Sequence, residues 1–313
     1  MMRWNRVLAG LVLCAGGAIA APFAYVPNEK AGSVSVIDIA TREVVNVIQL
    51  GGRPRGVAVH PDGSTLYLSD QPSGSLVVVD LPGGQVKQRI TLGESPEGIS
   101  ISSDGTLIAA AIEILNSVLL VDTATGRVVA RIPTEGKNPE HAVFSPDGRW
   151  LYVSAEEGSQ VDVIDVALRK QVAVVPVGKR PRGIAFTPDS ARAYVACELA
   201  STVYVVDVAS KKVIATIVAG EFANGVAMRP DGRQVFVSNG RGGSVSVIDS
   251  VSNRTVATVA VGQRPWNMAV TPDGSALYVA NGRSNSVSVV DTASSKLLGE
   301  IAVGELPWGV AIR

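Results

Sequence analysis

The side chains of this sequence that could bind or react recur at one position of a regular spacing. Six of them lie 25 residues before an aspartate that ends a run of β-branched residues, and a seventh follows Pro307 near the C-terminus. Taken in the order of the repeat, and beginning with that seventh one, they are Trp308, Arg55, Glu97, Glu140, Arg182, Asn224 and Trp266. Tryptophan and arginine are favoured at binding surfaces, so this set predicts a site for a ligand or a partner protein.

The residue that follows each of these positions adds a second chemical possibility. It is glycine in five repeats, and His141 and Asn267 in the other two. His141, Glu140 and Arg182 could form an acid–base cluster that opens a lactone or isomerises a substrate. The same residues also have structural interpretations, because neighbouring charges could pair with little energetic consequence and the tryptophans could close a channel.

The repeated aspartates define the elements that must hold these side chains. Their spacing of 42 or 43 residues indicates one structural unit copied seven times. They are Asp38, Asp80, Asp122, Asp165, Asp207, Asp249 and Asp291. One unit reads GVAV (56–59), the turn PDG (61–63), LYLSD (66–70), SLVVVD (75–80) and QVKQRITL (85–92). Valine-rich and isoleucine-rich runs bounded by turn residues predict four strands, named A to D here, and the aspartate is expected to accept backbone hydrogen bonds in the C–D turn.

This pattern predicts an all-β protein, a seven-bladed β-propeller of four-stranded antiparallel blades. A single sheet of this size buries too little surface to be stable alone, whereas seven sheets packed radially cover one another. The N-terminal segments FAYVPN, SVSVID and EVVNVIQL supply strands B, C and D of one blade, and residues 308–313 look like its strand A. We therefore expect the two ends of the chain to pair and close the ring.

The B–C and D–A loops of such blades lie at one end of the ring, where variable loops on a rigid scaffold usually bind. The seven side chains should project there, at the mouth of the central channel. The B–C loops of the third to fifth repeats are acidic, with Glu113, Glu156, Glu157 and Glu198. Those of the next three are basic, with Arg241, Arg283 and Lys30, and Arg264 lies beside the tryptophans. We expect an acidic side and a basic, aromatic side that holds a small planar or anionic ligand, a single nucleic-acid strand stacked on tryptophan, or a protein.

The blade motif carries a resemblance to a known family. AYVPN before SVSVID, LYVAN before SVSVVD, and the GVAV–PDG turn resemble the repeats of the YVTN β-propeller family over about residues 23–313. Within it, the chain is similar to the periplasmic propellers associated with pyrroloquinoline-quinone-dependent alcohol catabolism. That resemblance implies a role beside a periplasmic quinoprotein dehydrogenase or its c-type cytochrome.

The first twenty residues predict export. Two arginines, an apolar run and the small residues Ala18-Ile19-Ala20 form a secretory signal, with cleavage expected between Ala20 and Ala21 and a periplasmic location. Residues 21–313 are then one propeller domain. No other stretch is long enough to span a membrane. The whole chain carries 28 basic and 28 acidic residues, so general nucleic-acid binding is not expected.

Several common chemistries lack their residues in this sequence. Only two histidines are present, and Cys197 is the single cysteine after the signal, so neither a zinc cage nor a disulfide is expected. No haem-attachment motif, phosphate-binding glycine loop or nucleophile elbow occurs, and we expect no cofactor and no metal. Cys197 is expected to be a buried small residue, and His60 a turn residue. The leading hypothesis is a non-enzymatic binding or scaffold propeller, and the alternative is a lactonase-like hydrolase or isomerase that uses His141, Glu140 and Arg182.

Overall fold

The computed structural model of the protein describes residues 22–313, which form twenty-eight β-strands and no helix. The first fifteen strands in chain order are β1 Phe23–Asn28, β2 Ser33–Asp38, β3 Glu43–Gln49, β4 Pro54–Val59, β5 Thr65–Asp70, β6 Ser75–Asp80, β7 Gln85–Thr91, β8 Pro96–Ile101, β9 Leu107–Ile112, β10 Ser117–Asp122, β11 Arg127–Pro133, β12 Pro139–Phe144, β13 Trp150–Ala155, β14 Gln160–Asp165 and β15 Lys170–Pro176. The others are β16 Pro181–Phe186, β17 Arg192–Cys197, β18 Thr202–Asp207, β19 Lys212–Val218, β20 Ala223–Met228, β21 Gln234–Asn239, β22 Ser244–Asp249, β23 Arg254–Ala260, β24 Pro265–Val270, β25 Ala276–Asn281, β26 Ser286–Asp291, β27 Lys296–Ala302 and β28 Ala311–Ile312.

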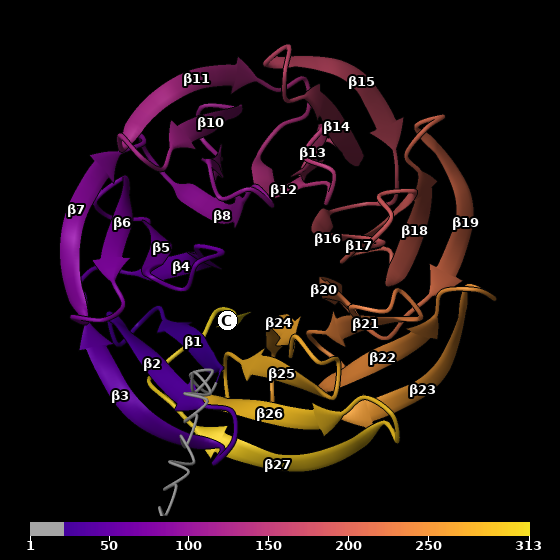
Figure 1. The fold of residues 1–313 in the computed structure, drawn as a ribbon. Helices are drawn as coiled ribbons and strands as arrows, with labels where there is room; N and C mark the ends of the chain where they lie inside the picture. The colour runs from indigo at the N-terminus through magenta and orange to yellow at the C-terminus, as the bar shows by residue number, and fades with distance from the viewer. Residues whose placement is uncertain (1–21) are drawn as a thin grey trace, which may run out of the picture.

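These strands make seven four-stranded antiparallel sheets set radially around a central axis (Figure 1). Six sheets contain four consecutive strands each, and in all of them strand A lies nearest the axis and strand D at the rim. The predicted fold class, a seven-bladed propeller with antiparallel blades, is confirmed. Blades are numbered by the order of their aspartates, so blade 1 is the one that contains β1.

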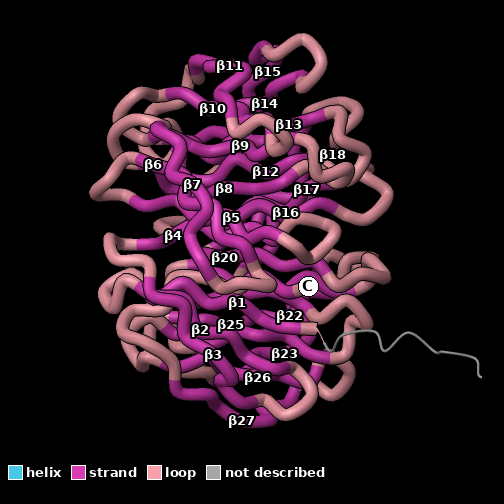
Figure 2. The backbone as a smooth tube through the Cα atoms, turned by 60° about the vertical axis from the view of Figure 1, so that its left-hand side comes forward, coloured by secondary structure: helices cyan, strands magenta, loops and turns pink. Residues whose placement is uncertain are grey.

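Blade 1 joins the two ends of the described chain, as its order β28-β1-β2-β3 shows. Tyr25 pairs with Ala311, and the backbones of Phe23 and Arg313 exchange two hydrogen bonds of 2.8 and 3.0 Å. Strand A is shorter here than the six residues expected, because regular pairing covers only β28 and one further bridge from Asn28 to Pro307. The predicted closure of the ring by main-chain pairing is confirmed. Figure 2 shows the backbone turned by 60° about the vertical axis, with strands forming most of the molecule and loops at the two ends of the blades.

The hydrophobic core is divided into seven clusters, each between two neighbouring blades. Between blades 4 and 5, for example, Tyr152 meets the edge of Phe186 with ring centroids 4.9 Å apart. Strands B and C are covered on both faces, so their sequences are almost continuously apolar, whereas strand D at the rim is largely exposed. Because each blade is packed on both sides, the loops at its ends are held on a rigid support.

The repeated aspartates act as predicted. The Oδ1 atoms of Asp38, Asp122 and Asp249 accept backbone N–H groups two or three residues later at 2.7–3.0 Å. A carboxylate at this position replaces backbone partners that the turn cannot supply. The aspartates are therefore structural residues of the C–D turns, at the opposite end from the predicted site.

Glycine at the start of strand A lets neighbouring blades touch at the centre. A Cβ atom on Gly56 would lie 2.7 Å from the carbonyl oxygen of Glu97, and one on Gly225 would lie 2.4 Å from that of Trp266. Ser69 on strand B accepts the Gly56 N–H at 2.8 Å and donates to the Glu97 carbonyl at 2.6 Å. Through Ser69, the backbone of Glu97 is therefore hydrogen-bonded to the preceding blade.

Within residues 22–313, no helix is long and apolar enough to cross a membrane. The predicted signal peptide, residues 1–20, lies outside the described residues, so its cleavage stays a prediction.

Candidate functional site

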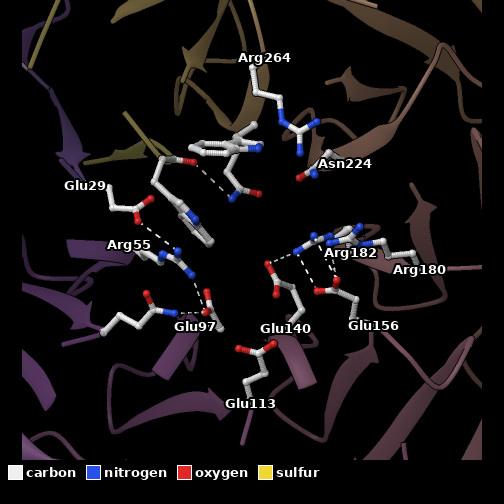
Figure 3. Close-up of a pocket in the computed structure, with 14 residues that line it drawn as sticks. Glu29, Arg55, Glu97, Glu113, Glu140, Glu156, Arg180, Arg182, Asn224 and Arg264 are labelled. Carbon is white, nitrogen blue, oxygen red and sulfur yellow. Dashed lines mark hydrogen bonds and ion pairs between the residues drawn. The ribbon is translucent and has the colours of Figure 1, made fainter. Parts of the chain in front are cut away.

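A cavity of about 250 Å³ lies at the end of the channel where the B–C and D–A loops meet, and we refer to it as the mouth cavity (Figure 3). All seven side chains predicted from the repeat line it, together with Arg264. The complete lining is Glu29, Arg55, Gln71, Glu97, Glu113, Glu140, Glu156, Arg180, Arg182, Asn224, Arg264, Trp266, Asn267 and Trp308. The spacing in the sequence thus brings together residues from all seven blades.

A second repeat position supplies part of this lining, namely the first residue after strand B. Sequence reasoning named Glu113 and Glu156 as loop residues but missed Glu29 and Gln71. The same 42- or 43-residue spacing would have found them, since the full set is Glu29, Gln71, Glu113, Glu156, Glu198, Gly240 and Gly282. Sequence reasoning also missed Arg180. This residue precedes the first proline of strand A in blade 5, as Arg264 does in blade 7.

One glycine of this second set, Gly282, makes room for the indole of Trp266. A Cβ atom on Gly282 would lie 2.9 Å from two atoms of the Trp266 indole. Blades 1–5 have glutamate or glutamine at this position. Blade 7 has glycine there, and the indole of Trp266 occupies the space that a side chain would fill. Arg264 lies over the same ring, with its guanidinium carbon 5.8 Å from the ring centroid.

On one side of the mouth cavity, Arg55 is held between two buried glutamates. Its Nη1 donates to Glu97 Oε1 at 2.5 Å and its Nη2 to Glu29 Oε1 at 3.1 Å. Arg53, half exposed, donates to the same oxygen of Glu29. Glu29 and Glu97 are 1% and 2% exposed, so these contacts are shielded from solvent, and loss of Arg55 would leave two buried carboxyl groups without their cationic partner.

On the opposite side, Arg182 is held by three carboxylates. Its Nη1 lies 2.5 Å from Glu140 Oε1 and 3.1 Å from Glu156 Oε2, and its Nε donates to Glu198 Oε2 at 3.0 Å. Burial alone would lower the pKa of Arg182, but the three carboxylates outweigh it and raise that pKa. Arg182 is therefore a permanent cation fixed in place.

Further ion pairs surround this cluster and connect it to the next blades. Arg180 pairs with Glu156 at 2.6 Å, and Arg264 reaches Glu198 at 3.2 Å. Of the expected acidic side and basic side, the acidic one is present, since Glu97, Glu113 and Glu140 lie together, but a separate basic side is not, because the arginines of the mouth cavity are paired with glutamates. Long arginine side chains cross from one blade to another, and the sequence gives no sign of their direction. Of the loop cations, Arg241 and Arg283 line a separate cavity, and Lys30 pairs with Glu305.

Between these two clusters, Glu97 and Glu113 are less fully paired. Glu97 Oε2 is buried and has no hydrogen-bond partner among the described residues. Glu113 accepts from Ser95 at 2.9 Å and from Asn138 at 3.4 Å, and has no cationic partner in the part of the chain that the structure describes. Burial, followed by the negative charge of Glu140, raises the pKa of Glu97 to about 8.

His141 lies deeper in the channel, in a second cavity of about 130 Å³. Its ring stacks on Trp308 at 5.5 Å, both ring nitrogens are buried, and the side chain of Asn267 is close enough to oppose the lowering of the His141 pKa. Burial, then the charge of Arg182, lowers its pKa to about 3. Glu140 is meanwhile engaged by Arg182, so the structure brings the three alternative catalytic residues near one another without joining them into one hydrogen-bonded cluster.

The remaining reactive side chains have structural surroundings. Cys197 is completely buried, and burial raises the pKa of its thiol to about 12, which fits the expected packing role. His60 contacts Asp62 at 2.8 Å within the A–B turn of blade 2, as expected of a turn residue. Among residues 22–313, no three His, Cys, Asp or Glu side chains are grouped so that they could hold a metal ion.

Comparison with known proteins places the chain among β-propellers. The family model described as "Lactonase, 7-bladed beta-propeller" matches residues 166–303, and that of the "SMP-30/Gluconolactonase/LRE-like region" matches residues 12–157. The chain is similar to both families. Each match covers less than half of it, so the similarity supports a β-propeller protein and no single activity. No curated protein matches the sequence.

Two solved structures show the same architecture. Hydrazine synthase of Kuenenia stuttgartiensis has a TM-score of 0.79 and 27% identity, over 86% of this chain and 92% of that one. A functionally unknown protein from Desulfotomaculum acetoxidans DSM 771 has a TM-score of 0.81 and 18% identity, over 93% and 98%. The second likeness concerns the fold alone.

Proposed function

We propose that the protein is an exported binding propeller whose mouth recognises its ligand or partner, and that it serves as an accessory to periplasmic quinoprotein alcohol oxidation. The observation that carries the binding role is the fixed ring of charges around the mouth cavity. Arg55 and Arg182 each bridge glutamates from different blades, so the recognition groups are positioned before anything binds. Such preorganisation lowers the entropy cost of binding.

The state of the candidate catalytic residues supports a non-enzymatic role. A general base near neutral pH needs a pKa close to that pH and access to a proton. His141 has a pKa of about 3 and buried ring nitrogens, and Glu140 is ion-paired with Arg182. Neither residue meets both requirements as the structure holds them.

The link to quinoprotein alcohol oxidation comes from the resemblance of the blade motif to the periplasmic propellers of that pathway. A dehydrogenase or c-type cytochrome would be recognised at the mouth through its charged ring and the half-buried Trp266. Periplasmic location rests on the N-terminal sequence.

A capture experiment from periplasmic extract tests this proposal. The wild-type protein should retain a quinoprotein or a c-type cytochrome, identified by mass spectrometry and haem absorbance. The double variant Trp266→Ala, Arg180→Ala should lose it, because both residues line the mouth cavity. Lys170→Ala, at the start of β15 on the opposite end, is the matched control and should behave as wild type. Equal capture by all three proteins, or no such protein in any of them, would reject the proposal.

One observation favours a second function, hydrolysis of a lactone. Glu97 lines the polar mouth cavity, and burial with the charge of Glu140 raises its pKa to about 8, which favours the protonated carboxyl that a general acid needs. The two family models also include lactonases. Proton release from γ- and δ-lactones in a pH-stat, present in wild type and abolished in Glu97→Gln, would establish this activity. No release above the uncatalysed rate would exclude it for these substrates.

A further inference from the structure

Three carboxyl groups from two neighbouring blades face the same part of the mouth cavity. Glu97 is on β8, Glu113 follows β9, and Glu140 is on β12; Figure 3 shows their side chains turned toward a common space between Arg55 and Arg182. Glu97 is 2% exposed, and its Oε2 atom is buried without a hydrogen-bond partner among the described residues. A buried acceptor without a partner carries a desolvation cost that a ligand donor would remove.

The charges of the cavity do not balance. Five glutamates and four arginines line it, which leaves one negative charge in excess when all five carboxyl groups are ionised, as above pH 8. Glu198 and Arg53 complete the ion pairs from outside the lining and add one charge of each sign. The excess falls on Glu113, which has no cationic partner among residues 22–313 and lies beside Glu97 and Glu140, whose Oε1 atoms are engaged by Arg55 and Arg182. An anionic ligand would meet this excess and would have to displace a carboxylate from an arginine.

From this arrangement we infer that the three carboxyl groups bind the ammonium group of a small organic amine. This rests on the proposed function, in which the mouth is the recognition site, and it specifies the ligand class. An alkylammonium group offers three N–H donors and one positive charge, which match three acceptors and one excess negative charge. Trp266 and Trp308 supply aromatic surface in the same cavity for the carbon part of the ligand.

A metal ion fits the site less well than an ammonium group. Metal ions bind carboxylate oxygens at about 2.0–2.6 Å, and so need their ligands close together. No such grouping of three side chains occurs in residues 22–313. An ammonium nitrogen donates to oxygens at about 2.7–2.9 Å, so its acceptors can lie farther apart than the ligands of a metal ion.

Binding of a cation here should compete with a proton on Glu97. The groups that face this carboxyl are Arg55, Gln71 and Ser95 by hydrogen bonding, and Glu140 and Glu113 by charge. Their combined effect, with burial, raises the pKa of Glu97 to about 8. Below that pH the carboxyl must lose its proton before it can accept the cation. The apparent affinity for an amine should therefore fall by up to about tenfold for each pH unit below 8.

Calorimetric titration of the mature protein with four probes at constant ionic strength tests the inference. The probes are ethylammonium, tetramethylammonium, calcium and inorganic phosphate. Ethylammonium should bind at pH 9 with a quenching of tryptophan fluorescence, and more weakly at pH 6.5 with release of about one proton. Tetramethylammonium, which lacks N–H donors, should bind at least about tenfold more weakly.

Variants identify the site without a large change in shape. Glu97→Gln mimics the protonated carboxyl, so it should fold normally, weaken ethylammonium binding at least about tenfold and remove the pH dependence below 8. Glu157→Gln changes an exposed glutamate of the neighbouring loop that is outside the lining, and should bind as wild type.

Four results would overturn the inference: stronger binding of calcium or phosphate than of ethylammonium, equal binding of the two ammonium ions, unchanged binding by Glu97→Gln, or no binding of any probe. Each of these leaves the capture experiment to judge the accessory function separately, because that experiment detects a protein partner and not a small amine.

Discussion

The imidazole of His141 stacks on the indole of Trp308 across the channel, with ring centroids 5.5 Å apart and planes inclined by 19°. The contact joins blade 4 to blade 1, the blade that closes the ring. The place of His141 in the repeat is glycine in five blades, as at Gly98, where a Cβ atom would lie 2.8 Å from the His141 ring. The histidine thus fills space that the glycines leave in the channel.

This stack makes a prediction about acid stability. Burial first, and the charge of Arg182 second, lower the pKa of His141 from 6.5 to about 3. Between these values the unfolded chain binds a proton that the folded chain does not, so stability present above pH 6.5 is lost as the pH falls toward 3. At pH 5 the loss from this residue is about 2 kcal/mol. His141→Phe keeps an aromatic stack and cannot titrate.

Denaturant unfolding at pH 7.5 and pH 5 checks this prediction. The free energy of unfolding of His141→Phe should decrease less than that of wild type between the two pH values, by about 2 kcal/mol. Val172→Thr, at an exposed position of the rim strand β15, changes no titratable group, so it should retain the wild-type pH dependence and serves as control. Identical pH dependence of wild type and His141→Phe would show that His141 is not protected from protonation.

A second prediction concerns the two arginines that flank the same glutamates. Arg182 is 13% exposed and bridges Glu140, Glu156 and Glu198, whereas Arg180 is 37% exposed and shares two of these partners. Removal of a buried cation leaves its carboxylates unpaired in a shielded site, so Arg182→Met should destabilise the fold by about 3–5 kcal/mol. Arg180→Met should cost about 1 kcal/mol or less. Chemical denaturation of both variants measures the difference in the free energy of unfolding. Equal losses would show that Arg182 contributes no more to stability than Arg180.

The fold could be predicted from the sequence because its signal is repeated seven times. A single blade read alone has ambiguous strands, but the aspartates from Asp38 to Asp291 fix the register of every copy. The closure between β1 and β28 followed from counting strands at the two ends. The length of β28 did not, because pairing at a chain end depends on local twist and not on composition.

The candidate site could be predicted only in part. The repeat located one set of lining residues, since a fixed place in each blade points to the same end of the channel. It did not show that Arg182 reaches Glu198 or that Arg264 does so from two blades away, because arginine side chains have many rotamers. The sequence also did not indicate that Glu97 is buried, although this burial influences whether its carboxyl group is charged.

A third prediction concerns the contact between neighbouring blades. An alanine at Gly225 would place Cβ 2.4 Å from the carbonyl oxygen of Trp266, and that carbonyl is held by Ser238. Because backbone atoms cannot move aside cheaply, Gly225→Ala should destabilise the protein by about 1–3 kcal/mol and shift the emission of Trp266. Gly299, on the rim strand β27, has no atom within 4 Å of such a Cβ. Gly299→Ala should be neutral or stabilise by up to about 1 kcal/mol, and thermal melts with fluorescence detection compare the two. A Gly225→Ala variant as stable as wild type would mean that the blades can separate there without cost.

The closing blade provides a last prediction. Removal of residues 307–313 takes away β28 and the backbone contacts of Phe23 with Arg313 and of Trp308 with Pro27. It would expose β1, whose Ala24 and Val26 are fully buried, as an unpaired edge. We expect the truncated protein to melt at least about 10 °C lower and to self-associate in size-exclusion chromatography. Arg313→Ala, which keeps the backbone pairing, should do neither. A synthetic peptide of residues 304–313 added to the truncated chain should restore the monomer and the melting temperature, because main-chain pairing needs no covalent link. A truncated protein that stays monomeric and melts like wild type would show that the blades hold the ring closed without this strand.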